Sequence, residues 1–89
     1  MDPQFLKSWV EICMAQGEQY SRRGELSKAE QQYLRALKSQ EELLKICRDE
    51  SGIRIAGEIC EILADLNMQQ GNMHGADVCY AKVLFYRNL

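Results

Sequence analysis

The residues best suited to catalysis or metal binding are four cysteines and a single histidine. A catalytic thiolate needs an adjacent base or a helix N-terminus, and a closed zinc site needs further Cys or His ligands at short spacing. No Cys-x-x-Cys pair occurs, and His74 has neither a second imidazole nor a cysteine pair nearby. The pattern therefore predicts no catalytic residue, no metal site and no cofactor, with His74 on the surface or in a turn.

The cysteines also lack the pattern of a disulfide framework, which would concentrate them in loops. All four fall among apolar residues at helical spacing, so we expect reduced, partly buried thiols. They are Cys13, Cys47, Cys60 and Cys79. A phosphate-binding loop is not indicated either, because the segment 71–75 (GNMHG) is not followed by Lys-Ser or Lys-Thr. The sequence therefore predicts a protein that is not an enzyme.

The charge pattern argues against nucleic acid as a partner. Eleven Lys and Arg stand against thirteen Asp and Glu, a net charge of −2, whereas phosphate binding usually requires a positive excess. One basic stripe is interrupted by Glu25, Glu30, Glu41 and Glu42, which is typical of a solvated helix face with mixed ion pairs. The stripe consists of Arg22, Arg23, Lys28, Arg35, Lys38, Lys45 and Arg48.

Length and composition indicate one small folded domain spanning residues 1–89. Apolar residues make up 46% and charged residues 27% of the 89 positions, with one proline, which is globular composition. No apolar run approaches the ~18 residues of a membrane span, and the first residues lack the pattern of a signal peptide. We expect an intracellular protein, cytoplasmic or nuclear, with no membrane partner.

The sequence contains an internal duplication. Shifting the chain by 47 positions aligns segment 11–37 with segment 58–84, and seven of the 27 positions are identical. The matches include Glu-Ile-Cys at 11–13 and 58–60, Gly24 with Gly71, and Tyr33 with Tyr80. This number of identities indicates an internal repeat.

Each copy reads as two helices, and no strand pattern appears. Asp2 and Pro3 are typical of a helix start, and the helix should end at Gly24. The second helix should run from Leu26 to about 49–52, the third from about 53 to 70, and the fourth from just after Gly71 to the chain end. The apolar face of the first helix is expected to contain Phe5, Leu6, Trp9, Ile12, Cys13, Gln16 and Tyr20. The third helix has a wider apolar face, which predicts packing on two sides. We therefore predict an all-α fold of two stacked helical hairpins, with repeats at about 3–50 and 52–89.

The spacing of small and aromatic residues resembles the tetratricopeptide repeat. In the first copy the matching positions are Gly17, Tyr20, Gly24, Ala29, Tyr33 and Ala36. The second copy departs from the pattern at Asn67 and Val83. The 47-residue period exceeds the family's ~34 and no proline closes the second helices, so the chain resembles a long-helix variant. The resemblance implies a protein-interaction scaffold or adaptor.

In this family, ligands commonly lie along a groove lined by the first helix of each repeat. The resemblance places seven residues on that face: Glu11, Met14, Glu18, Glu58, Glu61, Asp65 and Met68. Carboxylates facing one groove favour a basic or mixed basic and apolar segment, and methionines adapt to apolar groups. A solvated acidic face is the alternative. Family members that bind a chain-terminal carboxylate use Lys, Arg and Asn here, so the acidic residues argue against that activity.

A second apolar stripe lies on the last helix and comprises Val78, Phe85 and Leu89. The corresponding residues of the first copy are Gln31, Lys38 and Glu42, which are polar. Terminal repeats that face water usually have a polar outer face. The stripe therefore predicts a homodimer, or a following helix, docked on these residues. A structural homo-oligomerisation domain is accordingly the alternative to the adaptor function.

Overall fold

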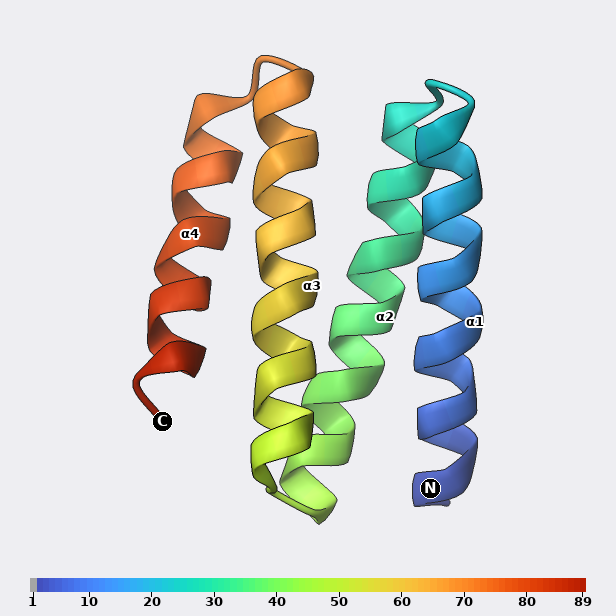
Figure 1. The fold of residues 1–89 in the computed structure, drawn as a ribbon, viewed down its shortest axis with the longest axis vertical. Coiled ribbons are helices and arrows are strands. Elements are labelled where there is room, and N and C mark those ends of the chain that lie inside the picture. The colour runs from blue at the N-terminus through green and yellow to red at the C-terminus, as the bar shows by residue number, and fades with distance from the viewer. Residues whose placement is uncertain (1) are drawn as a thin grey trace.

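The computed structural model describes residues 2–89 and confirms an all-α fold of two helical hairpins (Figure 1). The first hairpin consists of α1 (Pro3–Arg22) and α2 (Leu26–Ile46), and the second of α3 (Glu50–Gln69) and α4 (Met73–Arg87). The four helices form a row with α1 and α4 at its two ends. α2 packs on both α1 and α3, whereas no Cα atom of α1 lies within 8 Å of a Cα atom of α3.

Capping side chains fix where the odd-numbered helices begin. Asp2 accepts a hydrogen bond from the Gln4 amide at 3.0 Å, with Pro3 at the first helical position. Asp49 does the same for α3, because its Oδ1 accepts from the Gly52 amide at 2.7 Å. This cap explains why α3 begins at Glu50, three residues before the start expected from apolar spacing.

The backbone of the inter-helix turns repeats with the sequence. Gly24 and Gly71 both have φ of +78°, a left-handed conformation that residues with a Cβ rarely adopt. The Glu25 amide donates to the Tyr20 carbonyl at 2.9 Å. Forty-seven residues later, the Asn72 amide donates to the Asn67 carbonyl at 2.8 Å. The duplication inferred from the residues is therefore also present in the geometry of the turns.

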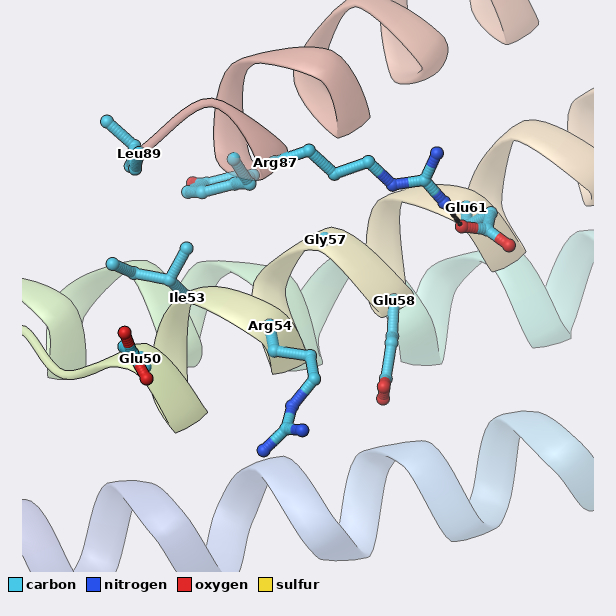
Figure 2. Close-up of a pocket in the computed structure, with 9 residues that line it drawn as sticks. Glu50, Ile53, Arg54, Gly57, Glu58, Glu61, Arg87 and Leu89 are labelled. Carbon is cyan, nitrogen blue, oxygen red and sulfur yellow. Dashed lines mark hydrogen bonds and ion pairs between the residues drawn. The ribbon is translucent and has the colours of Figure 1, made fainter.

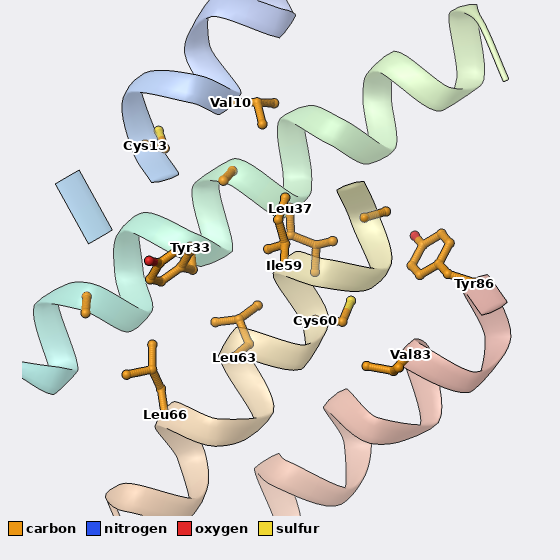
Figure 3. Close-up of a cluster of buried hydrophobic side chains, with 13 residues drawn as sticks. Val10, Cys13, Tyr33, Leu37, Ile59, Cys60, Leu63, Leu66, Val83 and Tyr86 are labelled. Carbon is orange, nitrogen blue, oxygen red and sulfur yellow. The ribbon is translucent and has the colours of Figure 1, made fainter. Parts of the chain in front are cut away.

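The hydrophobic core lies around the contact of α2 with α3 and extends outward to α1 and α4 (Figure 3). Ile59 and Leu63 of α3 are essentially inaccessible to solvent. Because α3 packs on α2 and on α4, it needs apolar residues on two sides, as its wide apolar face predicted. The polar contacts Tyr86 Oη to Glu41 at 2.8 Å and Lys82 Nζ to Glu41 at 3.7 Å link α4 to α2.

The apolar face expected for α1 is only partly buried. Phe5, Trp9 and Ile12 are exposed, whereas the helix buries Leu6, Val10, Cys13 and Gly17. α1 is the end of the row, so only the side toward α2 is covered. Apolar spacing identifies an apolar side of a helix, but it does not reveal whether a neighbouring helix lies there.

Candidate partner-binding groove

The separation of α1 from α3 leaves a groove between them with α2 beneath it. At the end where both helices begin, the groove widens into a hollow of about 490 Å³. Apolar side chains from all three helices line it, together with charged residues. The lining residues are Pro3, Lys7, Val10, Glu11, Gln40, Leu43, Cys47, Asp49, Ser51, Gly52 and Ile55.

Of the two carboxylates in the predicted set that lack a partner within residues 2–89, only Glu11 lines this hollow, whereas Glu58 lines the neighbouring depression between α3 and α4. Glu11 is on α1 and lines the hollow, and Glu58 is on α3. Figure 2 shows Arg54 and Glu58 projecting from α3 toward α1. Within residues 2–89 neither Glu11 nor Glu58 forms an ion pair. Their charge is therefore available to a ligand that enters the groove.

The other α1 residues of the predicted set contribute less negative charge. Met14 is half-buried and packs against the core. Glu18 is paired with Arg22 one turn further along the same helix. Exposed pairs at this spacing are worth little, so the Glu18 carboxylate can exchange Arg22 for another cation.

The remaining predicted residues on α3 lie toward α4 and away from α1. Glu61 accepts from Arg87 at 2.6 Å, and Asp65 accepts from the Tyr80 hydroxyl at 3.3 Å. The Met68 sulfur lies 3.7 Å from the same hydroxyl. Glu58 and Glu61 also border a second hollow of about 540 Å³ between α3 and α4 (Figure 2). The exposed face of α3 is thus a ridge between two depressions, and the seven residues do not line a single groove.

The floor of the α1–α3 groove was not among the predicted residues. Gln40 is buried at the α2–α3 contact, and its side-chain amide donates to the Gly52 carbonyl at 3.0 Å. Leu43 follows on the same face of α2, and Cys47, the residue after the helix, also lines the hollow. A signal was visible in the sequence, since Gln40 follows Ala36 at the next turn of an otherwise apolar face.

The predicted apolar stripe on α4 is exposed along its length. Val78, Phe85 and Leu89 have relative exposures of 48%, 59% and 51%. Phe85 and Leu89 line a hollow of about 670 Å³ on the side of α4 that faces α2. The opposite wall carries charges of both signs, with Lys38, Lys45 and Arg48 beside Glu41 and Glu42.

All four thiols are unpaired, but they differ in environment. Cys13 and Cys60 are buried and Cys79 is half-buried, whereas Cys47 is exposed at the groove, contrary to the expected partial burial. Burial raises the pKa of Cys13 and Cys79, and it raises the pKa of Cys60 to about 11. These three cysteines therefore remain protonated at neutral pH, which makes them poor nucleophiles.

Residues 2–89 contain neither a cluster of metal ligands nor a helix able to span a membrane. In residues 2–89, no three His, Cys, Asp or Glu side chains cluster closely enough to hold a metal ion. None of the helices described is both long and apolar enough to cross a membrane. Comparison with models of protein families, with curated proteins and with solved structures gives no match. The tetratricopeptide resemblance therefore remains a prediction based on the repeated residues.

Proposed function

We propose that the chain is a non-catalytic protein-interaction module that binds a basic or mixed basic and apolar segment of a partner in the groove between α1 and α3. The observation that carries the proposal is the combination of an apolar floor with carboxylates at the rim. Glu11 lines the hollow beside Lys7, and Glu58 stands on the neighbouring helix α3. Neither carboxylate is in an ion pair within residues 2–89, and Leu43 and Ile55 provide apolar surface in the hollow.

The geometry suggests a division of roles within the bound segment. An apolar partner side chain would occupy the hollow of about 490 Å³ against Val10, Leu43 and Ile55. Its burial would supply most of the affinity, because apolar area removed from water is worth roughly 25 cal/mol per Å². Lys or Arg residues beside it would face Glu11 and Glu58, where complementary charge mainly speeds association and selects the partner.

The unpaired thiols support a reducing compartment, the cytoplasm or the nucleus, as the place of action. The structural oligomerisation function remains a second candidate. It is supported by apolar side chains that are exposed at both ends of the row of helices, including Trp9 on α1 and Phe85 on α4.

A peptide-display selection against the isolated chain tests the groove. We expect enriched peptides that combine Lys or Arg with Leu, Met or Phe, and their binding should weaken as salt is raised. The double variant Glu11→Lys, Glu58→Lys should lose these peptides by tenfold or more. The variant Glu42→Lys, which reverses an exposed charge on α2 outside the groove, serves as the matched control and should keep them.

Circular dichroism on each variant separates lost binding from lost folding. If the double variant folds and binds the enriched peptides as tightly as the wild type, the acidic groove is only a solvated face. Enrichment of acidic peptides would also contradict the proposal, because the sign of the charge would be wrong.

A further inference from the structure

The contact between the two hairpins shows what kind of surface can pack against each end of the row of four helices. On the α2 side, Tyr33 and Leu37 are each only 5% exposed. On the α3 side, Ala56, Ile59 and Leu63 are 0 to 1% exposed. All five belong to the one buried core cluster, which is centred on α2 and α3 and extends to α1 and α4, and the Tyr33 ring also lies against Gly17 of α1 (Figure 3).

The C-terminal end of the row presents a copy of the α2 side of this contact. By the 47-residue repeat, Tyr80 and Leu84 of α4 correspond to Tyr33 and Leu37 of α2. Their relative exposures are 38% and 61%, because no helix follows α4 within the described residues. Met73, the counterpart of the half-buried Leu26, is 56% exposed on the same helix.

The N-terminal end of the row presents a copy of the α3 side. Trp9 and Ile12 of α1 correspond to Ala56 and Ile59 of α3. They are 39% and 47% exposed, whereas their counterparts in α3 are completely buried against α2. The two ends of the chain therefore carry the two halves of an interface that is already formed in its middle.

One polar contact shows that the two ends are also complementary in charge. Across the internal interface, Gln70 Nε2 donates to Glu30 Oε1 at 3.0 Å. The repeat maps Gln70 onto Arg23 and Glu30 onto Asp77. Both counterparts are exposed, and within residues 2–89 neither is in an ion pair. Docking α1 of one copy onto α4 of another would bring these opposite charges together.

We propose that copies of this chain associate head to tail, with α1 of one copy packed on α4 of the next as α3 packs on α2. In this arrangement Trp9 and Ile12 cover Leu84, and Arg23 pairs with Asp77. Because the two surfaces differ, each added copy leaves one free end of each kind, so growth continues beyond a dimer unless the rotation closes a ring.

The composition of the α1 face limits the strength of this association. Gln16 and Gln19 stand where α3 has Leu63 and Leu66, so only the part of the face around Trp9 and Ile12 is apolar. The contact is therefore reversible and depends on concentration. It uses a different side of α4 from Val78 and Phe85, which stand roughly 100 to 160° away around the helix from Tyr80 and Leu84.

Sedimentation of the chain over a range of concentrations tests the proposal. The weight-average mass should rise with concentration past that of two chains. Ile12→Glu, which disables the α1 face, and Leu84→Glu, which disables the α4 face, should each remain monomeric. A mixture of the two variants should form a 1:1 dimer and grow no further, because one intact face of each kind remains. Circular dichroism confirms that each variant is folded.

Charge variants and a matched control complete the experiment. Asp77→Arg and Arg23→Asp should each weaken association, and the double variant should restore it. Val78→Glu with Phe85→Glu should leave the mass unchanged. The proposal is overturned if the wild type stays monomeric at millimolar concentration, if the mixed variants fail to dimerise, or if only the Val78 and Phe85 variant abolishes association.

Discussion

The ring of Tyr33 lies against Gly17, so close that a Cβ on Gly17 would come within 2.7 Å of the ring's Cε2 atom. Tyr33 is on α2 and Gly17 is on α1, and both are buried. Because Gly17 has no side chain, α1 and α2 can approach each other closely at this point. The large ring of Tyr33 fills the space beside Gly17, so the contact between the two helices stays closely packed.

Adding a single methyl group at this position should loosen the first hairpin. We expect Gly17→Ala to lower the free energy of unfolding by about 1 to 3 kcal/mol, because overpacking a tight contact costs more than the helix gains from alanine. Gly57→Ala is the matched control, since a Cβ there would be 3.6 Å from the Tyr86 Cβ, an ordinary contact. Urea unfolding measures both. Equal effects would show that the Gly17 contact is not restrictive.

The thiols should react in an order set by their exposure. In the native chain Cys47 should react first with a thiol reagent and Cys79 more slowly, while Cys13 and Cys60 should react only as the chain opens. Without reductant, the unfolded chain should give four reactive thiols in total. The variant Cys47→Ser should lose the fast phase. An enriched groove peptide should slow the reaction of Cys47, because that residue lines the hollow.

Stability should decline at alkaline pH partly through Cys60. Its pKa is about 11 in the folded chain, against an ordinary value of 9.0. The unfolded state therefore releases this proton first, and the contribution to stability is full below pH 9 and is lost as pH rises toward 11. Cys60→Ala should show a smaller loss between pH 8.5 and 10.5, measured as the change in urea midpoint, although it starts from a lower stability. Identical pH slopes would exclude this linkage.

The cap at Asp49 should matter more than the cap at Asp2. Asp49→Ala removes the acceptor of the Gly52 amide between two packed hairpins, and we expect a loss of about 1 to 2 kcal/mol. Asp2→Ala affects the chain end, where one frayed turn costs less. Thermal unfolding compares the two variants. A larger effect at Asp2 would mean that the junction between α2 and α3 contributes little to stability.

Local signals in the sequence predicted the four helices and the two glycine turns, but they placed the end of α2 at 49–52, whereas the helix ends at Ile46 and Cys47 is extended. The positions of Gly24 and Gly71, and of Asp2 with Pro3, identified the turns and the first helix start, and the repeat identified the hairpins. The cap formed by Asp49 was not predicted. Asp is a common capping residue, but the start of α3 was placed by its apolar spacing, which begins only at Ile53.

The candidate site was only partly predictable, for a geometric reason. Glu58 and Glu61 stand three residues apart on one exposed helix side, yet Glu58 projects toward α1 and Glu61 pairs with Arg87 of α4. Periodicity identifies which residues share a side of a helix. It does not show which neighbouring helices flank that side, and those neighbours decide which carboxylates retain a free charge.

Close backbone packing within residues 2–89 joins sequence neighbours: α1 with α2, α2 with α3, and α3 with α4. α4 reaches α2 through side chains alone, such as Tyr86 with Glu41. Contacts between sequence neighbours close short loops, and folds built from them form quickly. During synthesis, α1 and α2 can therefore pair before α3 has left the ribosome, using the tight Gly17 and Tyr33 contact that needs nothing from the second hairpin. The nascent first hairpin then offers its Tyr33 and Leu37 face to α3 as that helix emerges, so the order of synthesis is also an order of assembly.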